Sequence, residues 1–460
     1  MTSSSSPISA QRRSELAQRI QDAMPGVRSD LEALTRIPSV SLGSFDQAHV
    51  DQSAQAVAEL LRAEGLEVQI VREGGAPAVL AHKAGPAGAP TITLYAHHDV
   101  QPPGDEKDWD SKPFEPVERD GRLYGRGAAD DKAGVMAHIA ALRAHGDQLP
   151  VGVNIFVEGE EEAGSESLPA ILEKYGDALA ADAIVLADSQ NWEIGTPALT
   201  TTLRGLVRAV VTVRTLSHSV HSGMFGGPLP DALTALAQLL TRLHDEKGDV
   251  AVPGLVSDDV TELAYDEQRL RAESGALPGT RLIGTGTILQ RLWGKPTMTV
   301  IGIDAPSVAT ASNTLVASAS AKLSMRIAPS QDPQVAWEAL RDFVLAQDVW
   351  GAQIEIDLDD IGPGFSANTQ GPVYDATRAA FASAWDGTDP VDIGVGGSIP
   401  FVAAFAERFP QAAILVTGVE DPDTRAHGAN ESLHLAEFEK VCLAEALLLE
   451  QLGTQGKADD

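Results

Sequence analysis

Cysteine is almost absent from this sequence, and that scarcity excludes two kinds of site. The 460 residues include a single cysteine, Cys442. An intrachain disulfide and a zinc site built from cysteine ligands are therefore both excluded. Cys442 lies in the apolar run 441–449, where we expect a buried and unreactive thiol.

Long apolar runs and positive charge are also scarce. No stretch approaches the roughly 20 consecutive apolar residues that a membrane-spanning helix needs, and residues 1–6 are polar, unlike a signal peptide. The 34 Lys and Arg against 65 Asp and Glu leave a formal net charge of -31. Such a surface repels phosphate backbones and anionic lipids, so we expect no nucleic-acid partner and no membrane partner. The lack of a signal core and of a long apolar run predicts a cytoplasmic location.

The length and the order of apolar patterns predict two domains, one inserted into the other. Helical periodicities alternate with short apolar runs up to about residue 205 and again from about 366, as in an α/β sheet covered on both faces. The intervening β-α-β-β-α-β order is typical of a ferredoxin-like domain. We therefore expect a doubly wound, mixed-sheet α/β domain from 1–205 and 366–460, interrupted by a ferredoxin-like α+β domain from 206–365. Near the N-terminus, Pro25–Gly26 predicts a break between two helices.

Five segments each place a metal-type side chain at the end of an expected strand or in the loop that follows. In open α/β sheets this edge is where ligands bind. Each segment alone has a simpler explanation, such as an N-cap aspartate or a solvated acidic loop. Together they offer two histidines and three carboxylates, which suits two divalent ions that share a bridging carboxylate. The five segments centre on His97, Asp130, the acidic run 158–162, Asp188 and His427.

Two of these segments suggest a division of roles between neighbouring residues. Strand periodicity puts His97 and Asp99 on one face and His98 on the other. We expect Asp99 to accept the second ring N–H of His97 and so orient it, which leaves His98 as a bystander. In the run 158–162, one carboxylate can bind metal while the next carries a proton.

Three further segments make the pattern specific: Trp-Asp-Ser-Lys-Pro-Phe at 109–114, His-Ser-Gly-Met-Phe-Gly-Gly at 221–227 and Gly-Gly-Ser-Ile-Pro at 396–400. With the five segments above, they resemble the metallopeptidase family of carnosinase, cytosolic non-specific dipeptidase, glutamate carboxypeptidase and succinyl-diaminopimelate desuccinylase. The resemblance covers almost the whole chain and is strongest to the dipeptidase and carnosinase branch.

The resemblance implies a metal site with assigned ligands. Asp130 bridges the two metals, and in the usual family arrangement His97 and Asp188 share one metal while Glu162 and His427 share the other. A pairing of His97 with Glu162 is the alternative. The resemblance makes Glu161 the general base and acid, and two divalent ions per subunit are implied. Zinc is favoured for these ligands, and manganese or cobalt also suits them.

The resemblance also implies how the substrate is held. His221 reaches from the inserted domain of a partner subunit to the carbonyl oxygen of the scissile bond, so a homodimer through that domain is expected. A second set binds the terminal carboxylate of the substrate: Arg326, Asn313, Gly397 and Ser398.

These expectations predict a dipeptidase that cleaves small peptides with a free C-terminus. The same site could instead act on N-acyl amino acids, as a deacylase. A non-catalytic metal-binding protein would lack the base, and Glu161 is present. A serine hydrolase is disfavoured because the contexts of Ser165 and Ser398 lack the spacing of a nucleophile elbow.

Overall fold

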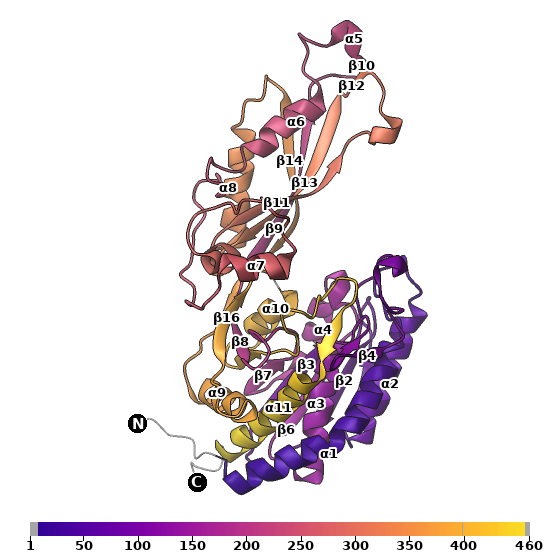
Figure 1. Cartoon of the computed structure of the whole chain (residues 1–460), viewed down its shortest axis with the longest axis vertical. Coiled ribbons are helices and arrows are strands. Elements are labelled where there is room, and N and C mark those ends of the chain that lie inside the picture. The colour runs from indigo at the N-terminus through magenta and orange to yellow at the C-terminus, as the bar shows by residue number, and fades with distance from the viewer. Residues whose placement is uncertain (1–7, 398, 456–460) are drawn as a thin grey trace. The chain divides into compact units, whose positions relative to one another are not determined.

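The structure is a computed structural model that describes residues 8–397 and 399–455 (Figure 1). The chain divides into two compact units. Unit 1 contains Met1–Thr201, Ala367–Ile393 and Pro400–Asp460, and unit 2 contains Thr202–Ser366 and Gly394–Ile399.

A mixed sheet forms the centre of unit 1, in the order β1-β2-β6-β3-β7-β17-β8-β15, with β16 also paired to β8. The strands β6, β3, β7 and β17 are mutually parallel, and the pairs on either side of them are antiparallel. The parallel strands are short and almost entirely buried, as expected for a sheet covered on both faces. The strand bounds are β1 (Glu67–Val71), β2 (Ala78–Lys83), β3 (Thr91–His97), β6 (Gly152–Glu158), β7 (Ala183–Leu186), β8 (Ala198–Leu203), β15 (Phe365–Ser366), β16 (Val391–Val395) and β17 (Ala413–Val416).

Helices cover both faces of this sheet. One face packs against α1, α2, α3, α9 and α11 in a single apolar core. The other face carries Tyr95, whose ring stacks on Phe401 of α10 with centroids 3.3 Å apart, and α10 contacts α4. This arrangement confirms the expected doubly wound α/β fold. The helices are α1 (Ala10–Thr35), α2 (Ala48–Ala63), α3 (Lys132–His145), α4 (Leu168–Tyr175), α9 (Pro372–Ala384), α10 (Pro400–Arg408) and α11 (Leu435–Gln455).

The predicted helix break at Pro25–Gly26 is wrong, because α1 continues through Pro25. A proline inside a helix costs about 3 kcal/mol. Apolar side chains on both sides of Pro25 lie on the buried face of the helix, and each contributes roughly 1.5–3 kcal/mol when buried. The summed contribution of these buried side chains exceeds the cost of the proline. The side chains are Leu16, Ile20, Val27, Leu31 and Leu34.

A small antiparallel sheet in unit 1, β18-β5-β4, was not predicted. It pairs β18 (Ser432–His434) with β5 (Arg122–Tyr124), and β5 with β4 (Val117–Arg119). Leu123 and Leu433, which face each other in register, are fully buried. This sheet joins two segments about 300 residues apart in the sequence.

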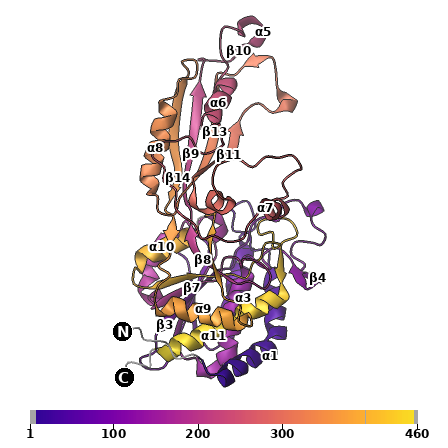
Figure 2. The same cartoon turned by 60° about the vertical axis from the view of Figure 1, so that its left-hand side comes forward.

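Unit 2 contains an antiparallel sheet in the order β11-β13-β9-β14, with α6 and α8 packed on one face (Figure 2). In chain order these strands are second, third, first and fourth, which is the ferredoxin-like arrangement and confirms that expectation. Strand β13 alternates buried and half-buried residues along its whole length. The elements are β9 (Gly205–Arg214), β10 (Val220–His221), α5 (Ser222–Phe225), α6 (Ala232–Thr241), α7 (Glu267–Ser274), β11 (Thr297–Asp304), β12 (Thr314–Leu315), β13 (Ser318–Ile327), α8 (Pro333–Leu345) and β14 (Gln353–Gly362).

Across residues 8–397 and 399–455, no helix is long and apolar enough to cross a membrane.

Candidate metal centre

The predicted ligands converge at the carboxyl end of the parallel strands of unit 1. His97 is the last residue of β3, and Asp188 follows β7, which pairs with β3. Glu162 lies in the short helical turn Glu161–Ala163, close after β6 on the other side of β3. Because these strands are parallel, their carboxyl ends meet at one edge of the sheet.

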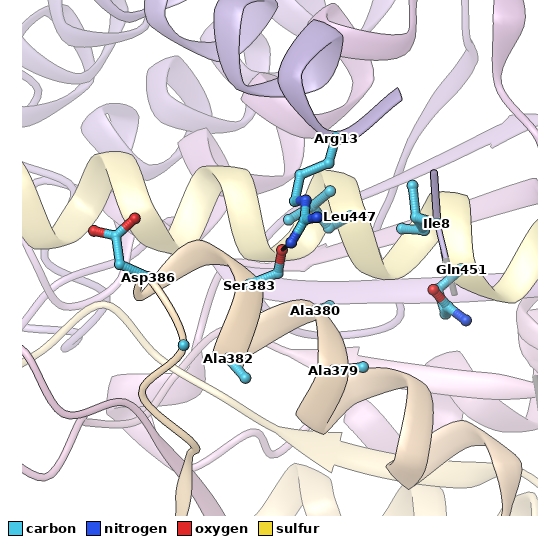
Figure 3. Close-up of a pocket in the computed structure, with 10 residues that line it drawn as sticks. Ile8, Arg13, Ala379, Ala380, Ala382, Ser383, Asp386, Leu447 and Gln451 are labelled. Carbon is cyan, nitrogen blue, oxygen red and sulfur yellow. Dashed lines mark hydrogen bonds between the residues drawn. The ribbon is translucent and has the colours of Figure 1, made fainter. Parts of the chain in front are cut away.

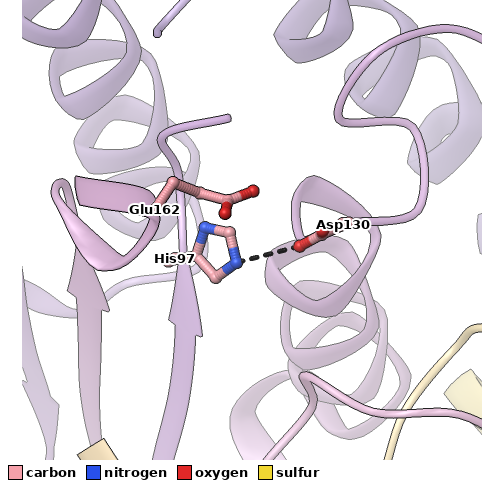
Figure 4. A group of neighbouring side chains, drawn as sticks. All are labelled: His97, Asp130 and Glu162. Carbon is pink, nitrogen blue, oxygen red and sulfur yellow. Dashed lines mark hydrogen bonds and ion pairs between the residues drawn. The ribbon is translucent and has the colours of Figure 1, made fainter. Parts of the chain in front are cut away.

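Asp130 lies between the two histidines of the predicted set. His97 Nε2 is 3.1 Å from Asp130 Oδ1 (Figure 4), and His427 Nε2 is 3.1 Å from Asp130 Oδ2. Each oxygen of one carboxylate therefore faces a different imidazole. A carboxylate in this position can bridge two cations, each held on its other side by a histidine.

The other two predicted ligands, Glu162 and Asp188, each lie near a different histidine. His427 Nε2 is 3.4 Å from Glu162 Oε2, and His97 Nε2 is 4.0 Å from Asp188 Oδ1. Ligand atoms of His97, Asp130 and Glu162 all lie within 4.8 Å of one another, as do those of His97, Asp131 and Asp188. The structure thus brings together all five residues that the sequence predicted.

Asp131 belongs to this cluster and was not predicted. Its Oδ1 accepts a hydrogen bond from Gly134 N–H at 3.2 Å, which makes Asp131 the N-cap of α3. Its Oδ2 accepts from the backbone N–H of His97 at 3.2 Å. The simpler explanation considered for Asp130, an N-cap aspartate, therefore applies to its neighbour. Asp130 keeps both oxygens for the histidines.

Asp99 has a wider role than the orientation of His97. Its carboxylate lies 3.4 Å from His97 Nδ1, while the hydrogen bond of that ring nitrogen goes to the carbonyl oxygen of Asp99 at 3.1 Å. The carboxylate also accepts backbone N–H groups from Glu161 and Glu162, at 3.2 and 3.1 Å. His98 points away, with Nε2 2.8 Å from the carbonyl of Pro77. Burial lowers the pKa of His98 to about 4, so it is a neutral structural residue.

Burial and mutual repulsion control the charge of the acidic side chains. Burial, and then the nearby charge of Asp130, raises the pKa of Glu162 to about 9. Burial also raises the pKa of Asp188 to about 6 and that of Glu161 well above its usual range. For His97, burial lowers the pKa, but hydrogen bonds to Asp130 and Asp99 outweigh it, and the pKa lies well above its ordinary value. The cluster therefore has the electrostatics of a cation site.

Unit 1 also has a cavity whose lining includes none of the predicted metal ligands. It has a volume of about 660 Å³ and is lined mostly by residues of α1, α9 and α11 (Figure 3). Arg13 Nη1 donates a hydrogen bond to Ser383 Oγ at 3.3 Å there. None of the residues predicted for the site lines this cavity.

Two of the predicted substrate residues lie together in unit 2. His221 ends β10 and pairs with Thr314 of β12, and the backbone of Asn313 accepts a hydrogen bond from Ser222 N–H at 2.9 Å. The ring Nδ1 of His221 accepts the N–H of Gly223 at 3.0 Å, so its Nε2 carries the ring proton and can donate. Both His221 and Asn313 are exposed.

Arg326 is the second-last residue of strand β13. Its cross-strand partner on β11 is Thr297, whose hydroxyl accepts a hydrogen bond from Arg204 Nη1 at 3.1 Å. Arg204 was not among the residues predicted for the site. It also donates a hydrogen bond from Nε to the carbonyl of Gly396 at 3.1 Å. Burial, and then the charge of Arg326, lowers the pKa of Arg204 to about 10. Gly397 is half-buried, and Ser398 lies outside the described residues.

Known proteins with similar sequences include dipeptidases. The chain is 35% identical over 375 residues to the cysteinylglycine-S-conjugate dipeptidase of Corynebacterium striatum, which covers 80% of this chain and 82% of that relative. It is 30% identical over 380 residues to the human Beta-Ala-His dipeptidase, which covers 78% of this chain and 74% of that relative.

Solved structures agree with these relatives. The dipeptidase Dug1p from Saccharomyces cerevisiae matches with a TM-score of 0.81 and 25% identity, over 96% of this chain and 98% of that one. Human carnosine dipeptidase 1 matches with a TM-score of 0.80 and 26% identity, over 97% of this chain and 100% of that one. A family model matches residues 93–451, a span that includes every predicted ligand. The chain belongs to peptidase family M20/M25/M40.

Proposed function

We propose that this peptidase uses two divalent metal ions to hydrolyse the amide bond of dipeptides that carry a free C-terminal carboxylate. The observation that carries the proposal is the position of Asp130, with one oxygen 3.1 Å from His97 and the other 3.1 Å from His427. The dipeptidases of Corynebacterium striatum and human, at 35% and 30% identity, support the substrate class.

The residues fit a pair of metal ions. His97 and Asp188 would hold one ion, Glu162 and His427 the other, and Asp130 both. Within the described part of the chain, Glu162 Oε1 is buried without a hydrogen-bond partner, as expected for an oxygen aimed at a cation. Mixed imidazole and carboxylate ligands suit zinc, our first choice, and also manganese and cobalt.

Glu161 is the proton carrier in this mechanism. When bound, the two ions polarise the scissile carbonyl and lower the pKa of water towards neutrality. Glu161 accepts the proton of the attacking water and donates it to the leaving amine nitrogen. Its burial raises its pKa well above the usual range, which suits a group that must hold a proton between the two steps. Asp99 holds the backbone N–H of Glu161 in place.

We assign the recognition of the substrate to residues of unit 2. Arg326 would pair with the terminal carboxylate, with Asn313, Gly397 and Ser398 as further contacts. A guanidinium and a carboxylate can form two parallel hydrogen bonds, which fixes the position of the scissile bond. His221 would donate to the carbonyl oxygen as negative charge develops on it.

The geometry of unit 2 supports a homodimer. The stretch 318–326 of β13 spans about 27 Å at roughly 3.4 Å per residue. Strand β10, which ends in His221, lies beyond the Ser318 end of β13 (Figure 1). A dipeptide extends over only about 7 Å. One unit 2 therefore does not bring both His221 and Arg326 to the same substrate. We propose that His221 acts in the site of a partner subunit, and that 206–365 is a lid and dimerisation domain while 1–205 and 366–460 form the catalytic domain.

We also propose a cytoplasmic location. The single cysteine, Cys442, is buried, so the chain makes no intrachain disulfide of the kind that stabilises proteins in oxidising compartments.

A reconstitution assay tests the proposed function. Metal-stripped protein is loaded with zinc or manganese and assayed on Ala-Gly and on N-acetylated amino acids. We expect activity on Ala-Gly that requires about two equivalents of metal. Cleavage of the N-acetylated compounds alone would instead identify a deacylase with the same site.

A further inference from the structure

The two loops that carry Asp130 and His427 leave the small β18-β5-β4 sheet at the same end. In the antiparallel register Ser432 pairs with Tyr124, so one loop begins where β5 ends and the other stops where β18 begins. The backbone N–H of Gly125 donates to the carbonyl of Glu431 at 3.0 Å. Beyond this pairing, both backbone hydrogen bonds and buried side chains hold the two loops.

Glu431 holds the loop that leads to Asp130. Its carboxylate is fully buried and accepts hydrogen bonds from the backbone N–H groups of Gly127, Ala129 and Asp130, at 3.1, 3.0 and 3.1 Å. It also accepts from Arg126 Nη1 at 2.6 Å. All four partners are donors, which only an ionised carboxylate can satisfy together.

Arg126 holds the other loop. Its side chain is 1% exposed, and Nη2 donates to the carbonyl of Gly428 at 3.0 Å, one residue after His427. That loop needs support, because Arg425, His427 and Asn430 all have positive φ values, of 57°, 61° and 63°. Non-glycine residues seldom adopt this conformation, and it persists only where the surroundings hold it.

We propose that Glu431 and Arg126 are positioning residues that form a buried ion pair between the two ligand loops and so set the metal affinity of the site. One partner fixes the backbone of Asp130, and the other fixes the backbone beside His427. Neither residue contacts the reacting groups. The inference rests on the proposed function, because it takes Asp130 and His427 as ligands. Replacing a residue that hydrogen-bonds to a metal ligand commonly changes the metal affinity by about 10–100-fold.

Calorimetric titration of metal-stripped protein with zinc tests this inference. In Glu431→Gln the amide presents an NH2 group to N–H donors, so it cannot accept all four hydrogen bonds, and zinc affinity should fall by about 10–100-fold. Arg126→Lys keeps the charge but cannot reach Glu431 and Gly428 together, and we expect a smaller fall. The matched control is Glu445→Gln, a buried carboxylate paired with His138 at 2.8 Å, which should bind zinc like the parent.

Each outcome of the titration decides between alternatives. Unchanged zinc affinity in folded Glu431→Gln and Arg126→Lys, or an equal fall in Glu445→Gln, would overturn the positioning role. Far-UV circular dichroism establishes folding, and if Glu431→Gln does not fold, Arg126→Lys decides alone. A parent protein that binds no zinc, manganese or cobalt would instead reject the proposed function, which separates the two failures.

Discussion

The backbone N–H of Glu161 donates a hydrogen bond to Asp99 Oδ1 at 3.2 Å. The other oxygen of the same carboxylate accepts the N–H of Glu162 at 3.1 Å, and His97 Nδ1 lies 3.4 Å from Oδ1. Asp99 therefore links the residue we assign as base to two proposed ligands, Glu162 in the same turn and His97 at the end of β3. This arrangement fixes the distance between the base and the proposed metal site.

Asp99→Asn tests this link. The side-chain amide of asparagine has one acceptor oxygen, and its NH2 group would face a backbone N–H donor. One of the two hydrogen bonds from Glu161 and Glu162 is therefore lost. We expect kcat for a dipeptide to fall by about 10–100-fold, with weaker metal binding. The control is Asp182→Asn, because Asp182 accepts the N–H of Thr91 at 2.8 Å outside the site. Parent-like kinetics in Asp99→Asn would reject the clamp.

Variants of Glu161 and Glu162 should differ in the amount of metal that they bind. Glu161→Gln should abolish turnover and retain about two metal ions, because Glu161 is assigned as base and not as ligand. Glu162→Gln should lose metal together with activity. Elemental analysis of both purified variants makes the comparison, and metal loss from Glu161→Gln would move that residue into the ligand set.

His221→Ala should lower kcat by roughly 10²–10³-fold, the usual effect of losing one donor to a developing oxyanion. If His221 acts in the partner's site, mixing this variant with Glu161→Gln subunits should restore part of the activity, since each hybrid dimer contains one complete site. Hybrids verified by mass spectrometry that show no recovery would contradict action across the interface.

Arg326→Met should raise KM and lower kcat for dipeptides, at a combined cost of about 3 kcal/mol or more if the ion pair with the substrate is desolvated. Dipeptide amides lack the carboxylate, so they should be poor substrates whose cleavage the change barely affects. Arg208→Met is the control, since Arg208 is paired with Asp360 at 2.8 Å. A parent enzyme that cleaves a dipeptide and its amide equally well would exclude the carboxylate clamp.

A buried ion pair that is not part of the proposed ligand set should make the stability of the protein depend on pH. Burial lowers the pKa of His138, but attraction to Glu445 outweighs it and leaves the pKa raised. Because the pKa of His138 is raised in the folded state, its protonation stabilises the fold. This contribution is complete at pH values below the unfolded pKa of about 6.5, and it is lost as the pH rises through the folded-state pKa. Glu445→Gln should therefore lower the free energy of unfolding by roughly 1–3 kcal/mol at pH 6 and by less at pH 9. Urea denaturation at both pH values measures this, and equal losses would contradict it.

Much of the fold was predictable because its strands have simple patterns. The short apolar runs that became β3 and β7 are buried on both faces, and β13 alternates along its length, as a half-covered antiparallel strand does. The fold class, the family resemblance and the prediction of a peptide-bond hydrolase are confirmed. The small sheet β18-β5-β4 escaped prediction because three-residue strands have too little pattern to detect.

The sequence by itself determined the chemical types in the site and their places at strand ends. His97, Asp130, the acidic run 158–162, Asp188 and His427 could be singled out because each follows an expected strand. The family resemblance then pointed to Glu162 within that run. Tertiary structure alone decided which aspartate caps α3, and it alone paired Glu431 with Arg126. The physical reason is that a buried donor or acceptor must find a partner. For groups some 300 residues apart, that partner is known only once the chain has folded.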